Sequence, residues 1–329
     1  MGETLTHERE SVVTRRMVGS VLQIFPVHLR ERLVSCRIRD AFLEEIRIRV
    51  GQPVMFSYGT EEWYLDAIDN RLTMRKEESY RMTEEDMQEM VTFLSRYSLY
   101  AFEEDIKSGF ITLEGGHRVG LAGQVRMERG KVADIRYISF LNIRIAKQRI
   151  NCAKEMVPYM VSQDSIHNTL IVSPPGIGKT TYLRDCIRIL SDGSSGKKGM
   201  KVCVIDERSE IAACHFGVPQ NDVGMRTDVL DRCSKAEGMV LMIRSMSPQI
   251  LAVDELGSRE DYQAVEQALN CGCRILGTVH AKDIQEIRKK EVMRNWMENQ
   301  TFGRYIVLKK LENGSRGFEV YDEKLERLC

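Results

Sequence analysis

A glycine-rich turn between a short apolar run and an amphipathic segment carries the clearest chemistry in this chain. Its glycines allow the backbone to curl so that successive N–H groups point at phosphate oxygens, and the helix expected after it adds a positive N-terminal end. We expect Lys179 to reach the β- and γ-phosphates of ATP and the Thr180 hydroxyl to hold Mg²⁺. In order, the predicted nucleotide-binding residues are Ser173, Pro174, Pro175, Gly176, Ile177, Gly178, Lys179, Thr180 and Thr181.

The turn departs from the strict phosphate-loop pattern at one position. That pattern has a glycine five residues before Gly178, where this chain has Ser173. A small residue followed by two prolines still turns tightly, and the Gly-x-Gly-Lys-Thr-Thr core is intact. An accidental turn before a helix is the competing interpretation, and the flanking strand and helix patterns disfavour it. We therefore predict a nucleotide site, with weaker affinity as the consequence expected from Ser173.

A second apolar run, 249–253, ends in the acidic pair Asp254-Glu255. This arrangement is typical of the hydrolysis motif of P-loop enzymes. We expect Asp254 to hold Mg²⁺ through water and Glu255 to polarise the attacking water as general base. Because phosphoryl transfer depends on positioning and charge neutralisation, both carboxylates must converge with Lys179.

Two further strand ends carry candidate residues. Asp206 and Glu207 follow the run 201–205, and carboxylates at such a position lie at the ligand crevice of an open parallel sheet. A solvated acidic turn is the alternative. His280 follows the buried run 275–279, where it senses the γ-phosphate or simply forms a hydrogen bond at a strand end; spacing alone does not separate the two.

Composition narrows the class of protein. With 48 basic and 48 acidic residues the net charge is +0, so the basic footprint of sequence-independent nucleic-acid binding is missing and no nucleic-acid partner is expected. The nine cysteines form no Cys-x-x-Cys pair, which favours reduced thiols and a cytoplasmic location. No apolar run is long enough to span a membrane, so we expect membrane contact only through a partner.

The pattern of elements predicts two domains in 329 residues. Residues 1–146 are expected to form a smaller α+β domain, with an N-terminal helix that stops at Pro26 and an antiparallel sheet. Residues 147–166 form a linker or joining helix. Strands alternate with helices in 167–329, which predicts an α/β domain with a mostly parallel sheet and a C-terminal hairpin turning at Asn313-Gly314. The polar run 192–199 is expected to be a flexible loop.

With these motifs assembled, the chain resembles the type II/type IV secretion ATPases over nearly its whole length, and within them a branch that acts in sporulation. The segments that carry the resemblance, besides the phosphate loop, are 97–101, 109–112, 115–123, 141–146, 204–210, 243–248, 253–257 and 278–281. The resemblance implies a RecA/AAA-like P-loop NTPase fold. It also implies an ATPase that drives assembly of, or transport through, a membrane channel between mother cell and forespore.

The resemblance extends to particular residues and partners. It implies a hexameric ring with ATP between subunits, and membrane-embedded partners among the stage III A sporulation channel proteins. Asp206-Glu207 are similar to the family's aspartate box, and the segment ending at His280 is similar to its histidine box. Arg118 and Arg144 are similar to arginines that the family brings to the phosphates, since a guanidinium binds phosphate oxygens bidentately. A solvent-facing strand residue is the alternative for Arg118.

Two rival functions are compatible with the sequence. A nucleic-acid-dependent motor on the same P-loop core is disfavoured by the neutral charge and by the lack of interleaved aromatic and basic residues. A nucleotide-binding scaffold with negligible hydrolysis is disfavoured by Asp254-Glu255, although Ser173 keeps it possible.

Overall fold

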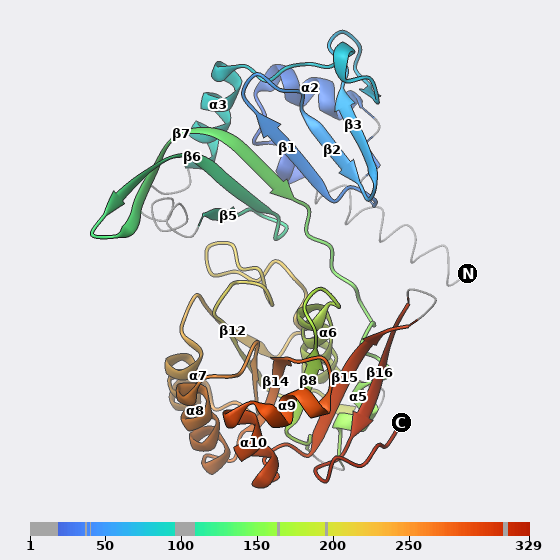
Figure 1. The fold of residues 1–329 in the computed structure, drawn as a ribbon, viewed down its shortest axis with the longest axis vertical. Helices are drawn as coiled ribbons and strands as arrows, with labels where there is room; N and C mark the ends of the chain where they lie inside the picture. Colours follow the sequence, from blue (N-terminus) through green and yellow to red (C-terminus); the bar gives the residue numbers. More distant parts are fainter. Residues whose placement is uncertain are drawn as a thin grey trace. The chain divides into compact units, whose positions relative to one another are not determined.

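The computed structural model describes residues 19–36, 38–39, 41–95, 109–162, 165–194, 197–311 and 315–329. The chain divides into two compact units, Met1–Lys147 and Gln148–Cys329. Each unit has a seven-stranded sheet and its own hydrophobic core (Figure 1). The predicted domain boundaries at 146 and 167 stay a prediction. The motif at 97–101 and the turn at 313–314 lie outside the described residues.

The sheet of the first unit is antiparallel throughout, in the order β4-β3-β2-β1-β7-β6-β5. Alternation along β1 buries Ile46 and Ile48, and the strand forms a hairpin with β2 through the pair Glu45 and Ser57. The strands are β1 (Glu45–Arg49), β2 (Met55–Tyr58), β3 (Glu61–Leu65), β4 (Leu72–Thr73), β5 (Phe110–Thr112), β6 (Arg118–Glu128) and β7 (Lys131–Arg144).

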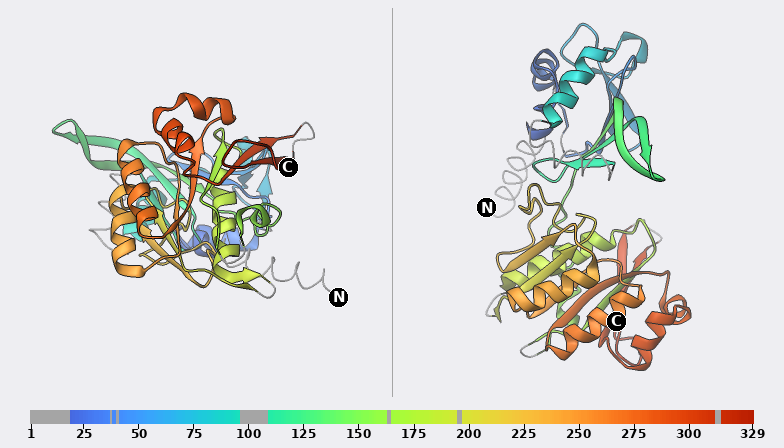
Figure 2. Two further views of the ribbon diagram at one scale, coloured as in Figure 1. Left: turned by 90° about the horizontal axis from the view of Figure 1, so that it is seen from below. Right: turned by 90° about the vertical axis from the view of Figure 1, so that its left-hand side faces the viewer.

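Two helices, α2 (Val27–Ser35) and α3 (Glu84–Ser95), cover one face of this sheet (Figure 2), and a short 3₁₀ turn, η1 (Lys76–Glu78), precedes α3. A capping box opens α3: Asp86 N–H donates to Thr83 Oγ1 and Thr83 N–H donates to Asp86 Oδ2. Within the described residues, 19–22 are helical and this helix ends before Pro26, as the sequence predicts. Pro26 is the N-cap of α2, a position where its missing N–H costs nothing.

The second unit has the mostly parallel sheet that the sequence predicts, in the order β12-β11-β13-β14-β8-β15-β16 with only β16 antiparallel. Its central strands are buried on both faces, as expected when helices cover both sides. The strands are β8 (Thr169–Ser173), β11 (Val202–Asp206), β12 (Thr227–Asp231), β13 (Ile250–Val253), β14 (Arg274–His280), β15 (Arg304–Lys310) and β16 (Arg316–Tyr321).

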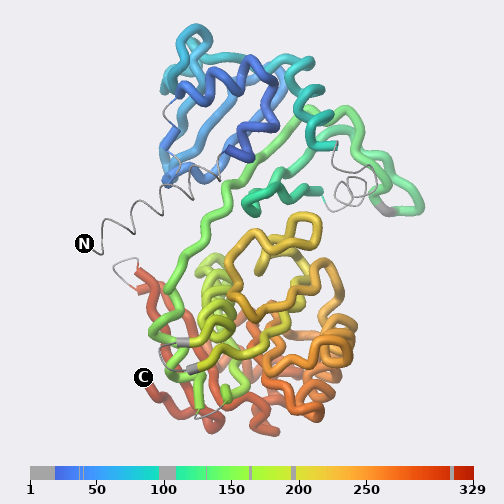
Figure 3. The backbone as a smooth tube through the Cα atoms, turned by 180° about the vertical axis from the view of Figure 1, so that it is seen from behind, coloured from blue at the N-terminus to red at the C-terminus, as the bar shows by residue number. Residues whose placement is uncertain are grey.

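Helices pack on the two faces of this sheet as separate layers (Figures 2 and 3). α5 (Val157–Met160) and α6 (Lys179–Asp192) share one core with the sheet. α7 (Lys235–Met246), α8 (Arg259–Asn270), α9 (Ile284–Lys289) and α10 (Glu291–Glu298) share the other. Parallel pairing therefore brings the carboxyl ends of β8, β11, β13 and β14 to one edge.

The polar run 192–199 differs from the flexible loop that was expected. β9 (Gly193–Ser194) and β10 (Lys197–Lys198) pair as a two-stranded hairpin directly after α6. Gly193 is the C-cap of that helix at φ 82°, a left-handed conformation that glycine adopts without strain and that reverses the chain.

No helix in the described part of the chain is long and apolar enough to cross a membrane.

Candidate nucleotide site

The glycine-rich turn joins β8 to α6 in the conformation that its sequence predicts. Gly176 and Gly178 have φ values of 81° and 103°, which L-residues with a side chain rarely adopt. Ser173, in place of the pattern's glycine, is fully buried, and its hydroxyl donates to the Pro174 carbonyl at 2.8 Å. The serine is therefore accommodated at the end of β8, and α6 begins at Lys179.

The ammonium group of Lys179 faces an acidic pair. Its side chain is 5% exposed, and Nζ lies 3.6 Å from Asp254 Oδ1 and 3.7 Å from Glu255 Oε1, beyond hydrogen-bond distance. Nζ has no hydrogen-bond partner within the described residues. Burial lowers the pKa of Lys179 although both carboxylates oppose this shift. An incompletely bonded buried cation is the group that phosphate oxygens would satisfy.

The Asp254 carboxylate accepts hydrogen bonds from two hydroxyl groups. Thr180 Oγ1 donates to Asp254 Oδ2 at 2.7 Å, and Thr278 Oγ1, on β14, donates to Asp254 Oδ1. Thr180 and Asp254 thus supply the hydroxyl and the carboxylate that Mg²⁺ takes beside nucleotide phosphates. No group of three or more acidic, His or Cys side chains suited to a metal occurs in the described part of the chain. The donor set therefore fits Mg²⁺ bound together with phosphate, not a metal cage of protein ligands alone.

Glu255 is held in a defined and strained position. Its φ of 56° is left-handed, and its N–H donates to Thr278 Oγ1 at 2.9 Å. Oε1 lies 2.8 Å from His280 Nε2, and Oε2 lies 2.8 Å from Arg208 Nη1. Burial raises the pKa of Glu255, but the His280 hydrogen bond and the positive charges of Lys179 and Arg208 outweigh it and leave the pKa lowered. Glu255 is therefore a carboxylate at neutral pH, the form that accepts a proton.

Asp206 uses both of its carboxylate oxygens inside its own loop. Oδ1 accepts the N–H of Glu210 at 2.8 Å, and Oδ2 accepts those of Ile211 at 3.0 Å and Ala212 at 2.8 Å. Burial raises the pKa of Asp206 against these hydrogen bonds. Arg184 on α6 donates to the carbonyls of Glu210 and Ile211, so the loop is fixed from two sides. Direct contact between Asp206 and a nucleotide stays a prediction.

A lysine that sequence reasoning missed contacts both Glu207 and Glu255. Lys235, at the start of α7, lies 3.2 Å from Glu207 Oε2 and donates to the Glu255 carbonyl at 3.0 Å. Its Nζ is also 3.9 Å from Asp261 Oδ2, in the capping box of α8. Asp206, Glu207, Arg208, Glu210, Asp254 and Glu255 line one small hollow. Only long-range packing brings Lys235 there, and no local pattern indicates it.

Arg118 and Arg144 lie in the first unit, directly opposite each other on β6 and β7. The Arg118 guanidinium lies over the Phe110 ring, 4.6 Å from its centroid. Arg144 is exposed, and its partner on the other side is Glu45 of β1. Like charges directly opposite on a sheet repel each other, an arrangement that an anion would relieve. Their action on phosphates stays a prediction.

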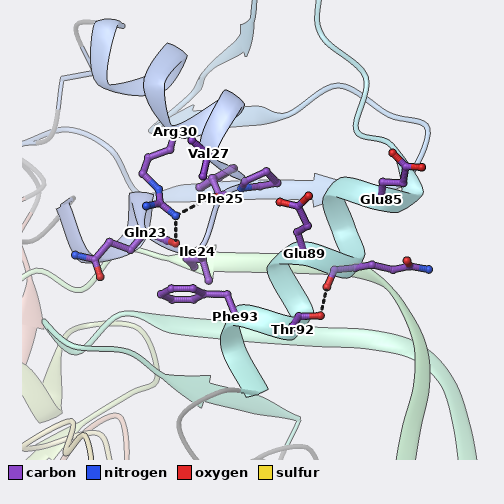
Figure 4. Close-up of a pocket in the computed structure, with 11 residues that line it drawn as sticks. Gln23, Ile24, Phe25, Val27, Arg30, Glu85, Glu89, Thr92 and Phe93 are labelled. Atoms are coloured by element: carbon purple, nitrogen blue, oxygen red, sulfur yellow. Dashed lines mark hydrogen bonds between the residues drawn. The ribbon is translucent and has the colours of Figure 1, made fainter.

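The first unit also has a hollow between α2 and α3, which Figure 4 shows. Arg30 extends along it and donates to the carbonyls of Gln23 at 2.9 Å and Phe25 at 3.1 Å. Glu85 and Glu89 of α3 line the same hollow. None of the predicted site residues lines it.

Comparison with known proteins agrees with these motifs. The sequence model of the family described as "Sporulation stage III, protein AA" matches residues 15–328. Stage III sporulation protein AA of Bacillus subtilis (strain 168) is 41% identical over 281 residues, covering 85% of this chain and 87% of that protein. The uncharacterized protein ycf45 of Cyanidium caldarium is 27% identical over 195 residues, covering 58% of this chain and 52% of that protein.

Among solved structures, the ATPase DotB of Legionella pneumophila has a TM-score of 0.55 at 15% identity, covering 86% of this chain and 77% of that one. The pilus retraction motor PilT with bound ADP also has a TM-score of 0.55 at 15% identity, covering 84% and 78%. At this identity the likeness concerns the fold. It confirms the predicted α/β P-loop fold.

The hydrogen bonds of Asp206 predict a stability effect. Asp206→Asn replaces one acceptor oxygen with an N–H₂ group that faces backbone donors, and we expect a loss of about 1–3 kcal/mol in the free energy of unfolding. The control is Asp228→Asn on the adjacent β12, whose side chain is exposed and should change stability by less than about 0.5 kcal/mol. Urea unfolding monitored on the second unit measures both. Equal stability of the two variants would show that the loop does not depend on this carboxylate.

Proposed function

We propose that this chain, which belongs to the sporulation stage III, protein AA family, binds ATP at the P-loop and hydrolyses it. The observation that carries the proposal is the convergence of Lys179, Asp254 and Glu255 within 4 Å at the carboxyl edge of the sheet. Hydrolysis of a phosphoric anhydride uses these groups: a buried cation, a hydroxyl–carboxylate pair for Mg²⁺ and an oriented carboxylate that accepts a proton.

Each residue has a defined part in this reaction. Residues 173–181 bind the phosphates, with backbone N–H groups supplied from Gly176 onward because Pro174 and Pro175 have none, and Lys179 neutralises charge on the β- and γ-phosphates. Thr180 and Asp254 would hold Mg²⁺, which supplies neutralisation of the charge that develops on the leaving group. Glu255 accepts a proton from the attacking water. Its bonds to His280 and Arg208 fix its orientation in the structure, and one of them must yield as the water binds.

The proposal extends to the residues around this centre. The Glu207 carboxylate lies 3.2 Å from Lys235 Nζ, and the same Nζ donates to the backbone carbonyl of Glu255. The side chain of Lys235 therefore links Glu207 of the aspartate box to Glu255, the proposed base. The contact made by His280 depends on the protonation and position of Glu255, because the ring Nε2 lies 2.8 Å from Glu255 Oε1. Both residues therefore act on catalysis by positioning Glu255.

We propose that this ATP hydrolysis serves sporulation. The subunits form a ring, most simply a hexamer, and Arg118 and Arg144 of one subunit complete the phosphate site of the next. Hydrolysis then drives assembly of, or transport through, a membrane-embedded channel built from the stage III A proteins, which the ATPase meets from the cytoplasm on the mother-cell side. The sporulation family and the secretion-ATPase fold support this reading.

The catalytic assignment is tested by separating binding from hydrolysis. Glu255→Gln keeps the size and polarity of the side chain but accepts no proton, so ATP binding should stay near wild type while phosphate release falls by about 100-fold or more. Lys179→Ala removes the phosphate-facing cation and should lose binding itself. Calorimetric titration with ATP and a phosphate-release assay measure the two effects. Equal turnover by wild type and Glu255→Gln would refute the role of Glu255.

The shared site is tested by mixing two inactive variants. Arg144→Ala keeps its own P-loop but presents no arginine to its neighbour, whereas Lys179→Ala keeps the arginine and has a defective P-loop. Each alone should have little activity, and a mixture should regain part of it at interfaces that pair an intact P-loop with an intact Arg144.

Arg136→Ala, which removes an exposed arginine farther along the same strand, is the matched control and should retain activity alone. A mixture that is no more active than the sum of its parts would contradict a site completed in trans.

A further inference from the structure

The C-terminal hairpin reaches the phosphate loop. β15 runs parallel to β8, with Val307 opposite Val172, so its last residues lie at the same sheet edge as the loop. β16 returns antiparallel from this edge, and Arg316 is its first residue, paired with Lys310. Arg316 shares a strand face with Val320, which packs in the core beneath α6. The topology therefore brings the Arg316 side chain to the edge and face from which α6 starts.

The guanidinium of Arg316 lies directly against the loop glycine Gly178. A Cβ built on Gly178 would be 2.9 Å from Nη1, 3.2 Å from Cζ and 3.4 Å from Nη2 of Arg316. Gly178 thus has two reasons to lack a side chain, its left-handed φ of 103° and this contact. The charge also reaches the first turn of α6: burial raises the pKa of Tyr182, and the positive charge of Arg316 opposes that shift.

This position is unfavourable for a cation in the protein alone. Gly178 is the N-cap of α6, and the positive end of a helix dipole repels an adjacent guanidinium. Arg316 has no hydrogen-bond acceptor or ion-pair partner among the residues that the structure describes, although it is half-buried. A cation held at a helix N-terminus, beside a loop of phosphate-binding N–H groups, is stabilised by an anion bound between them.

We propose that Arg316 is a phosphate-binding residue of the nucleotide site, supplied by the same subunit through the β15–β16 hairpin. The inference rests on the proposed ATPase function and names an additional ligand of its substrate, the polyphosphate common to ADP and ATP. The hairpin then responds to nucleotide, because bound phosphate converts repulsion at Gly178 into a bridged contact.

The test combines nucleotide affinity with the stability of the nucleotide-free protein. Arg316→Ala should weaken Mg·ADP and Mg·ATP binding alike, by about 10- to 100-fold, because a hydrogen-bonded charge pair is lost. Arg316→Lys keeps the charge without the planar fork and should fall between wild type and alanine. Lys310→Ala, the exposed neighbour paired with Arg316, is the matched control and should change affinity by less than about 2-fold.

The second readout separates phosphate binding from a structural role. Without nucleotide, Arg316→Ala relieves repulsion at the α6 N-terminus, so its melting temperature should equal or exceed that of wild type. A lowered melting temperature together with unchanged affinity would show a packing role and overturn the inference. A changed preference between ATP and GTP would mean contact with the base and would also overturn it.

Failure of the underlying function gives a different result. If Lys179→Ala loses binding and Arg316→Ala binds like wild type, only the role of Arg316 is refuted. If wild type itself binds no ADP or ATP, the proposed function and the role of Arg316 fall together.

Discussion

One electrostatic constraint organises the second unit: the buried ammonium of Lys179 lies opposite the carboxylates of Asp254 and Glu255. Burying either charge alone would be costly, so the two sides stabilise each other only if the sheet holds them together. Lys179 begins the helix that follows β8, and the two carboxylates follow β13. The strand between β8 and β13 is β14, which supplies Thr278, whose hydroxyl contacts both Asp254 and the Glu255 N–H. This strand order therefore places the ammonium, the two carboxylates and the threonine hydroxyl together at one edge of the sheet.

The same constraint explains why Glu255 has so many polar contacts. Lys179 alone is too distant for a hydrogen bond, and Arg208 and His280 complete the coordination of the carboxylate. Positive groups that surround a carboxylate keep it ionised and oriented, at the expense of its freedom to accept a proton from water. In the proposed cycle, phosphate oxygens pair with part of the positive charge that surrounds Glu255. The Glu255 carboxylate can then accept a proton from the attacking water.

The sequence was sufficient where the signal is local. Glycine spacing predicted the loop, and apolar runs ending in acids predicted where β11 and β13 stop. It was insufficient where the contact depends on packing of distant segments. Lys235 and Arg184 lie outside the motifs that the sequence shows, yet they fix the two acidic loops. Asp206 shows a further limit, since its position at a strand end was predicted but its binding to three backbone N–H groups was not.

The central claim is that this site hydrolyses ATP and is completed between subunits. The most direct measurement is phosphate release per subunit from Mg·ATP over a wide range of protein concentration, with Lys179→Ala as the blank. We expect release above the blank and a rate per subunit that rises with concentration to a plateau as subunits associate. No release above the blank at any concentration would contradict hydrolysis and favour a nucleotide-binding scaffold.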